Sequence, residues 1–407
     1  MIIRPGRHYV VEAFTNSDCF ARPFGADNIL HDLRHDDQWL QELISKAYEA
    51  GCSKVPKHIN LLYYQAGKYT LVFLIEPIQD EIQPLIMQIA RDSSDSALGQ
   101  TVLRDHANLK YLQGSAVPMY TPKAIGEPQC IEVLGRPSIP IIFTEYLDGY
   151  HELMYGDDIG PDADYFYLNR PGSEARSFTA SESRTVMRDI AATVSHIYAA
   201  TFDANVGTGK LASNVSILAG DFVYRAAADF PEPRIKLVTV RNLEDASPRE
   251  LMHALAAPIS TFPWLMGTAT AGYSLDTDQR SDVTLYAGIL SGMRAGTGRF
   301  DHELFAAWRE SFSSKTLNDI EGFFNGIATG QIATFNDISP GYRKLFQCFA
   351  ERHYLNSMGG KWKDLDNAEG NPAFQALREP ELIDLIVAEA GKNSKMFDKF
   401  GNLETET

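Results

Sequence analysis

Hydrophobic and polar positions follow two patterns along the chain: short apolar runs in the first part and, mainly in the second part, a helical period of three and four. Three runs rich in aliphatic and aromatic residues lie at 59–64, 69–75 and 85–90. Gly67 and a polar loop that contains proline separate them, and runs of this length between turn residues are typical of strands. The pattern predicts three short antiparallel strands, then a helix over 100–113 and a pair of strands that ends at 139–149.

Apolar residues at helical spacing dominate the chain from about residue 182 onward. Segments with this spacing, some with Ser, Asp or Pro near their starts, lie at 182–200, 248–257, 282–294, 301–312, 316–326, 340–355 and 380–390. Upstream of the strands, one helical stretch at 37–48 ends at Gly51. The sequence therefore predicts an α+β protein of two lobes, a small antiparallel β-rich N-lobe and a larger helical C-lobe. The expected segments are an N-terminal extension 1–55, the β-rich lobe 56–149 ending in a hinge, the helical lobe 150–391 and a polar tail 392–407.

Composition narrows the classes of partner. With 407 residues, of which 44% are apolar and 22% charged, the chain can bury a large core. Its net charge of −16 would repel a phosphate backbone, so we expect no nucleic-acid partner. No apolar run is long enough for a spanning helix and the first residues lack the apolar core of a secretory signal, so we expect a cytoplasmic protein without a membrane partner. The four cysteines show no CxxC spacing, and no metal site is predicted from them.

Two stretches in the second half carry the candidate chemistry. Residues 217–225 read Ile-Leu-Ala-Gly-Asp-Phe-Val-Tyr-Arg, and a second apolar run follows at 234–241. A Gly-Asp pair after an apolar run is a common turn, because glycine permits positive φ and aspartate bonds its own backbone. In that reading Asp221 is structural and the residues after it continue a strand. The alternative, that Asp221 is catalytic, depends on the wider pattern around it.

The order of elements and these two stretches resemble the protein-kinase-like fold over roughly residues 56–310, in particular the aminoglycoside and choline phosphotransferase branch. The resemblance implies that Gly67 and Lys68 lie in the turn that covers the nucleotide phosphates. It implies that Glu145 and Tyr146 lie in the hinge, where backbone groups bond the adenine edge. It also implies that Asp221 is the base that accepts the proton of a substrate hydroxyl.

The chain departs from the family pattern at four charged or polar positions. The phosphate-pairing lysine is replaced by Gln88, and the glutamate that orients it by His106. The asparagine and the aspartate that hold metal ions are replaced by Ala226 and Thr239, and a hydroxyl lacks the charge that magnesium needs. At about 1.4 kcal/mol per tenfold in rate, losing all four would slow phosphoryl transfer by several orders of magnitude. The resemblance thus implies ATP and Mg²⁺ as ligands, whereas the replaced residues argue against both.

Acidic residues near the second stretch offer a replacement metal site. The candidates are Asp229, Glu244 and Asp245, which flank the 234–241 run. The other interpretation is that they are solvated loop acids. The spacing does not separate the two.

Two function hypotheses follow from this pattern. In the first, the chain is a pseudokinase-like protein that binds a small ligand or a protein partner through a kinase-type cleft, with phosphotransfer lost or altered. In the second, it is a small-molecule phosphotransferase that uses ATP, with Asp221 as the base. Whether it is an enzyme stays open at this point. Both hypotheses predict that Gln88, His106, Asp221 and Thr239 surround one cleft.

Overall fold

A computed structural model describes most of the chain in two compact units. The described residues are 2–5, 37–52, 54–66, 69–78, 81–115, 118–131, 138–155, 166–169, 175–212, 221–226, 233–261, 279–299, 302–310, 315–334 and 337–343, with 346 and 384. The first unit comprises Met1–Tyr150, Pro171–Ser173 and Leu237–Asn242, and the second comprises His151–Arg170, Glu174–Lys236 and Leu243–Thr407. The chain therefore returns to the first unit for the short 237–242 segment.

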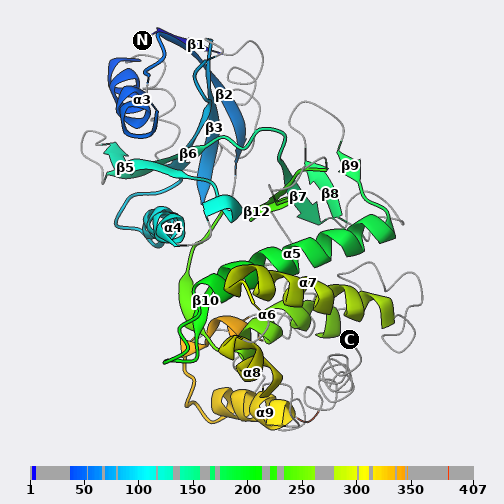
Figure 1. Ribbon diagram of the computed structural model, residues 1–407. Helices are drawn as coiled ribbons and strands as arrows, with labels where there is room; N and C mark the ends of the chain where they lie inside the picture. Colours follow the sequence, from blue (N-terminus) through cyan, green and yellow to red (C-terminus); the bar gives the residue numbers. More distant parts are fainter. Residues whose placement is uncertain are drawn as a thin grey trace. The chain divides into compact units, whose positions relative to one another are not determined.

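The first unit is built on a six-stranded sheet with the order β1-β2-β3-β4-β6-β5 (Figure 1). Its strands are β1 (Ile2–Pro5), β2 (His58–Ala66), β3 (Thr70–Pro77), β4 (Leu85–Ala90), β5 (Ala124–Ile131) and β6 (Ile139–Glu145). Neighbouring strands are antiparallel except β1 and β2, which are parallel. The three antiparallel strands predicted from the apolar runs correspond to β2, β3 and β4.

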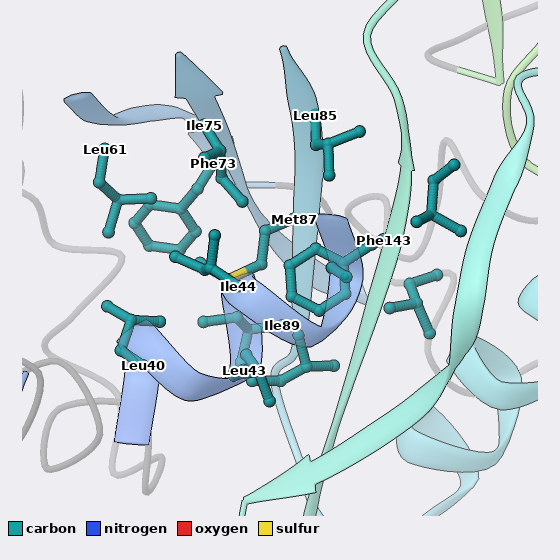
Figure 2. Close-up of a cluster of buried hydrophobic side chains, with 14 of the residues drawn as sticks. Leu40, Leu43, Ile44, Leu61, Phe73, Ile75, Leu85, Met87, Ile89 and Phe143 are labelled. Atoms are coloured by element: carbon teal, nitrogen blue, oxygen red, sulfur yellow. The ribbon is translucent and has the colours of Figure 1, made fainter. Parts of the chain in front are cut away.

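One face of this sheet is buried under the helix α3 (Asp37–Gly51). Leu40, Leu43 and Ile44 of α3 point toward Phe73 and Met87 on the sheet (Figure 2). Along β4 the buried residues alternate with half-buried ones, so that Gln88 stands on the opposite face of the sheet. The helix predicted at 37–48 thus belongs to the core of the first unit.

A second helix of this unit, α4 (Ala97–Gly114), packs against β4, β5 and β6 and against the short 3₁₀ helix η1 (Pro118–Tyr120). Ser96 caps its first turn, because its hydroxyl accepts a hydrogen bond from the N–H of Gly99 at 3.0 Å. Its buried apolar residues are Val102, Leu109 and Leu112. Two polar residues, Asp105 and His106, are buried on the same helix.

The second unit combines short strands with most of the helices (Figure 1). Its strands are β7 (His151–Tyr155), β8 (Phe166–Asn169), β9 (Arg176–Ser177), β10 (Gly209–Ala212), β11 (Phe222–Tyr224), β12 (Ile235–Leu237) and β13 (Leu243–Ala246). One sheet has the order β12-β11-β7-β8-β9, and β10 pairs with β13 in an antiparallel ladder. The helices are α5 (Ala180–Ala200), α6 (Pro248–Thr261), α7 (Gln279–Thr297), α8 (Glu303–Glu310) and α9 (Lys315–Ala328).

The predicted helices 182–200, 248–257, 282–294, 301–312 and 316–326 are confirmed as α5 to α9, and α4 confirms the helix predicted at 100–113. The strands β7 to β10 and β13 are not predicted by the sequence pattern. Most of the helices predicted at 340–355 and 380–390, the tail 392–407 and residues 6–36 lie outside the described residues. The division into an extension, two lobes and a tail stays a prediction.

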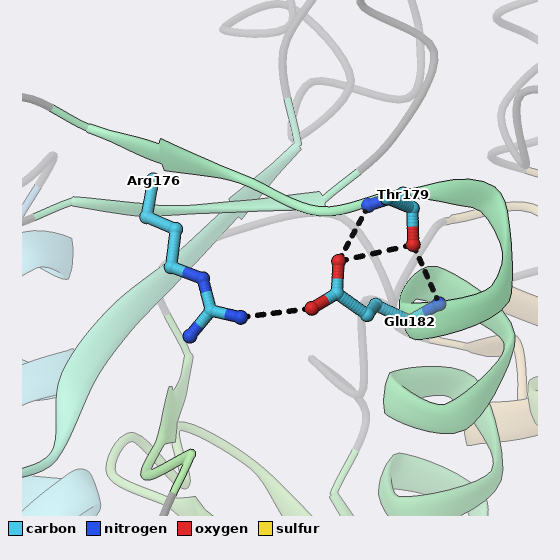
Figure 3. A network of polar contacts seen from close by, with 3 residues as sticks. All are labelled: Arg176, Thr179 and Glu182. Atoms are coloured by element: carbon cyan, nitrogen blue, oxygen red, sulfur yellow. Dashed lines mark hydrogen bonds and ion pairs between the residues drawn. The ribbon is translucent and has the colours of Figure 1, made fainter.

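A capping box fixes the first turn of α5 (Figure 3). The Thr179 hydroxyl accepts from the N–H of Glu182 at 3.3 Å, and the Glu182 carboxylate accepts from the N–H of Thr179 at 2.8 Å. Arg176 reaches the other oxygen of Glu182 at 2.8 Å. The bonds from Thr179 are the main reason that the pKa of Glu182 is lowered.

Helices α5 and α7 lie side by side along a row of glycines (Figure 1). A Cβ added at Gly288, Gly292 or Gly296 would lie 2.4, 2.2 or 2.7 Å from a carbonyl oxygen of α5. These oxygens belong to Arg188, Ala192 and His196, so both helices advance by four residues between contacts, in the same direction. Only glycine allows two helix backbones to approach this closely.

Replacing Gly292 by alanine is expected to push α7 away from α5. The added Cβ would lie 2.2 Å from the Ala192 carbonyl oxygen, which belongs to a helix backbone and cannot rotate away. We expect Gly292→Ala to lower the free energy of unfolding by about 1–3 kcal/mol, measured by urea denaturation. The matched control is Gly322→Ala in α9, where nothing lies within 4 Å of the added Cβ. Its helix propensity should raise stability by up to about 1 kcal/mol, and equal stability of the two variants would contradict the close approach.

Two expectations from composition can be compared with the structure. No described helix is both long and apolar enough to cross a membrane. Of the cysteines in the described part of the chain, Cys52 and Cys130 are free thiols. Cytoplasmic residence stays a prediction.

Candidate functional site

The 237–242 segment, which carries Thr239, is held in the first unit by two side chains of α4. The Val240 N–H donates to Asp105 Oδ1, and Asn108 Nδ2 donates to the Val240 carbonyl at 2.7 Å. Val240 itself is fully buried, and Asp105 is 5% exposed. We call this pair of contacts the Val240 clamp. It satisfies both polar groups of a residue that lies between β12 and β13 and has no strand partner.

The next residue of the segment contacts the start of β3. The Arg241 guanidinium lies over the Tyr69 ring, with its carbon 4.5 Å from the ring centroid. This distance is within the range of a cation–π interaction. The segment is therefore attached to α4 on one side and to Tyr69 on the other. Tyr69 directly follows Gly67 and Lys68, the two residues expected to cover phosphates, which lie outside the described residues.

His106, one position after the first residue of the clamp, is directed toward β5. Its side chain is 1% exposed and makes a hydrogen bond with the backbone of Ile125. Burial lowers its pKa, Lys110 lowers the pKa further, and Glu127 and the Ile125 bond act in the opposite direction. The ring is therefore neutral near pH 7. Its Nε2 atom has no hydrogen-bond partner within the described part of the chain.

Gln88 is half-buried on the face of the sheet that α3 does not cover. Its backbone lies between Val72 of β3 and Ile142 of β6 in the ladder. No hydrogen bond between Gln88 and His106 is found among the described residues, and Nε2 of the His106 ring has no partner there. The lysine–glutamate pair of the family therefore has no neutral hydrogen-bonded counterpart at these positions.

The expected hinge follows β6 directly. The Glu145 N–H donates to the Lys123 carbonyl at 2.9 Å, and the Tyr146 N–H donates to the Pro84 carbonyl at 3.3 Å. Burial is the main cause that raises the pKa of the Tyr146 hydroxyl. Both N–H groups thus already have acceptors within the first unit. Recognition of an adenine edge by these two residues would depend on their carbonyls or on the residues after them.

Asp221 belongs to the second unit and stands directly before β11. Its side chain is 5% exposed, and the Gly220 and Ala219 positions before it lie outside the described residues. The strand begins at Phe222, as the turn-and-strand interpretation of this motif expects. Ala226, at the position of the metal-binding asparagine, is exposed in the turn after β11. Gln88, His106 and Thr239 belong to the first unit, so their grouping with Asp221 around one cleft stays a prediction.

Two of the three acids proposed as replacement metal ligands form ion pairs. Glu244 accepts from Arg343 at 2.7 Å, and Asp245 pairs with Lys210 at 2.9 Å. The third acid, Asp229, lies outside the described residues. No group of three or more His, Cys, Asp or Glu side chains that could hold a metal ion is found in the described part of the chain.

Asp105 and Asn108 are the residues of this region that sequence reasoning did not single out. Both lie in the stretch compared with the helix of the kinase glutamate, where attention fell on His106. The available signal was Asp105 itself, an acid between Val102 and Leu109 on the apolar side of a predicted helix. An acid at such a position requires a buried donor.

Comparisons with known proteins find likeness only to solved structures. No family model matches the chain, and no curated protein matches it. A microcompartment-associated aminopropanol kinase is 13% identical, with 80% of this chain and 99% of that chain covered and a TM-score of 0.31. The choline kinase LicA from Streptococcus pneumoniae is 10% identical, with 68% and 97% covered and a TM-score of 0.32. WaaP, solved in complex with acyl carrier protein, is 13% identical, with 61% and 86% covered and a TM-score of 0.30. Scores this low do not establish a shared fold. The kinase-like assignment stays a proposal.

Removing the carboxylate of the Val240 clamp is expected to destabilise the first unit. In Asp105→Ala the buried Val240 N–H loses its acceptor, which costs about 1–3 kcal/mol of unfolding free energy. The control is Arg104→Ala on the same turn of α4, where the side chain is exposed and a change within about 0.5 kcal/mol is expected. Urea denaturation of both variants measures the difference. An Asp105→Ala protein as stable as Arg104→Ala would show that the clamp contributes nothing.

Proposed function

We propose that this chain is a pseudokinase-like protein that binds a small ligand or a protein partner, with phosphotransfer lost or altered. The observation that carries the proposal is the Val240 clamp. It fixes the backbone beside Thr239 through the side chains of Asp105 and Asn108 of α4. In the family that the sequence resembles, an aspartate at the Thr239 position holds magnesium.

The charges near the proposed site support loss of phosphotransfer. The residue at the glutamate position is the buried, neutral His106, and the residue at the lysine position is the uncharged Gln88. Phosphoryl transfer depends on positive charge placed on the phosphate oxygens, because its catalysis is mainly electrostatic. Glu244 and Asp245 are engaged by Arg343 and Lys210, so recruiting them to a metal would break two ion pairs.

The alternative function is an ATP-dependent small-molecule phosphotransferase with Asp221 as the base. The observation in its favour is the position of Asp221, a carboxylate only 5% exposed at the start of a short strand. A buried carboxylate has its proton affinity set by its surroundings, as a general base requires. In this case the chain would need a metal arrangement different from that of the family.

A thermal-shift titration with ATP and GTP, each with and without Mg²⁺ or Mn²⁺, separates the two functions. A ligand at a hundred times its Kd stabilises the folded state by about 2.7 kcal/mol, which is measurable for the full chain. The pseudokinase-like proposal predicts the same shift with and without metal, and no transfer of phosphate. A shift that requires metal, together with transfer of phosphate that is lost in Asp221→Asn, would favour the phosphotransferase. No shift with any nucleotide would exclude ATP and GTP as ligands.

Restoring a metal ligand tests the kinase-like placement itself. If Thr239 occupies the position of the metal-binding aspartate, Thr239→Asp should introduce a metal-dependent component into the nucleotide shift. Thr239→Asn has the same size without the charge and is the matched control. Metal-independent behaviour of both variants would remove the basis for assigning Thr239 to a nucleotide site.

A further inference from the structure

One turn of α4 makes two contacts, and only one of them includes a histidine that can take up a proton. Asp105 and Asn108 form the Val240 clamp, and between them His106 packs against β5. The imidazole is 1% exposed, and its Nε2 has no hydrogen-bond partner within the described residues. Protonation would place a cation with an unsatisfied donor in the packed interface between α4 and β5. Such a charge is strongly unfavourable unless the interface opens to water.

The charged groups around the ring do not compensate for this cost. Lys110, one turn further along α4, repels a cation at His106, whereas Glu127 of β5 attracts it. Lys110 and Glu127 form an ion pair with each other at the exposed edge of the interface. Among the other elements packed against α4, β4 carries no ionisable side chain. The other ionisable side chains on these elements are Glu145 of β6, Tyr120 of η1 and Arg241 of the clamped segment.

We propose that this turn of α4 is a proton-sensitive latch. Uptake of a proton by His106 loosens α4 from β5, and the same movement releases the 237–242 segment from the Val240 clamp. The latch couples proton concentration to the position of the segment that carries Thr239. It does not rest on the proposed function, because its readout requires no ligand.

The direction and size of the effect follow from linkage. In the closed state the pKa of His106 is lowered, so the closed state binds fewer protons than an open state in which the ring has its ordinary pKa of about 6.5. Opening is therefore favoured as the pH falls below about 6.5. Between pH 7.5 and pH 5.5 the opening equilibrium should rise, by at most about tenfold, which is the limit for a ring that titrates only in the open state.

Amide hydrogen exchange of the full chain at pH 7.5 and pH 5.5 measures this opening directly. The Val240 N–H is bonded to Asp105, so peptides that cover 237–242 report release of the clamp. After correction for the intrinsic pH dependence of exchange, we expect more opening of this segment at pH 5.5 in the wild-type protein, by up to about tenfold. In His106→Gln, which is polar but does not titrate, the pH dependence should disappear. His106→Met, an apolar replacement that adapts to irregular space, provides a second variant if the first fails to fold.

His196 of α5 supplies the matched control. It is also buried, and burial lowers its pKa to about 4, but it belongs to the second unit. His196→Gln should leave the pH dependence of 237–242 unchanged. Amides in the middle of α5 report global unfolding, and they should not follow the 237–242 segment. The latch is overturned if the segment opens equally at both pH values, if it opens only together with α5, or if His106→Gln retains the pH dependence of the wild-type protein.

Discussion

Buried peptide groups that lie outside a strand or helix need hydrogen-bond partners, and at Val240 in the 237–242 segment side chains supply them. The chain leaves the second unit after Lys236 and returns to it at Leu243, so the segment between contributes no strand to the six-stranded sheet. Asp105 and Asn108 supply the partners for Val240. Each hydrogen bond adds only modestly to the free energy of unfolding. An unpaired Val240 N–H or carbonyl in the interior would lower that free energy by more. The clamp is therefore what allows Val240 of the 237–242 segment to be buried in the first unit.

The clamp also affects how we interpret the positions that differ from the kinase pattern, Gln88, His106 and Thr239. In the resemblance to kinases, the helix and the metal-binding segment are related through charges on the lysine, the glutamate and the metal ligand. Here the helix α4 binds the segment through neutral and charge-assisted bonds to the main chain, and His106 turns to β5. The helix and the segment are thus attached without a charged pair at positions 88 and 106.

Much of the fold could be predicted from the sequence because its long elements repeat their hydrophobic period several times. The three-and-four spacing of α5 is an example, and this helix is confirmed. The strands β7 to β10 and β13 of the second unit were missed because they are short. Arg176–Ser177 contains two residues, which cannot express a period of two. The candidate site was predicted less well, because the clamp joins residues 135 positions apart and no local pattern records such a pairing.

The glycine row between α5 and α7 fixes the distance between two helices without fixing their register. Its contacts repeat every four residues on both helices, so a displacement by one turn would place Gly292 against Arg188 and Gly296 against Ala192. Two of the three contacts between a glycine and a carbonyl oxygen would form again after such a displacement. The unique alignment must come from features that do not repeat, such as the capping box at Thr179 and the bond from the Tyr198 hydroxyl to the Ala246 carbonyl at 2.8 Å. In this pair of helices, the glycines set the distance between the helices, and other residues set their alignment along the helix axes.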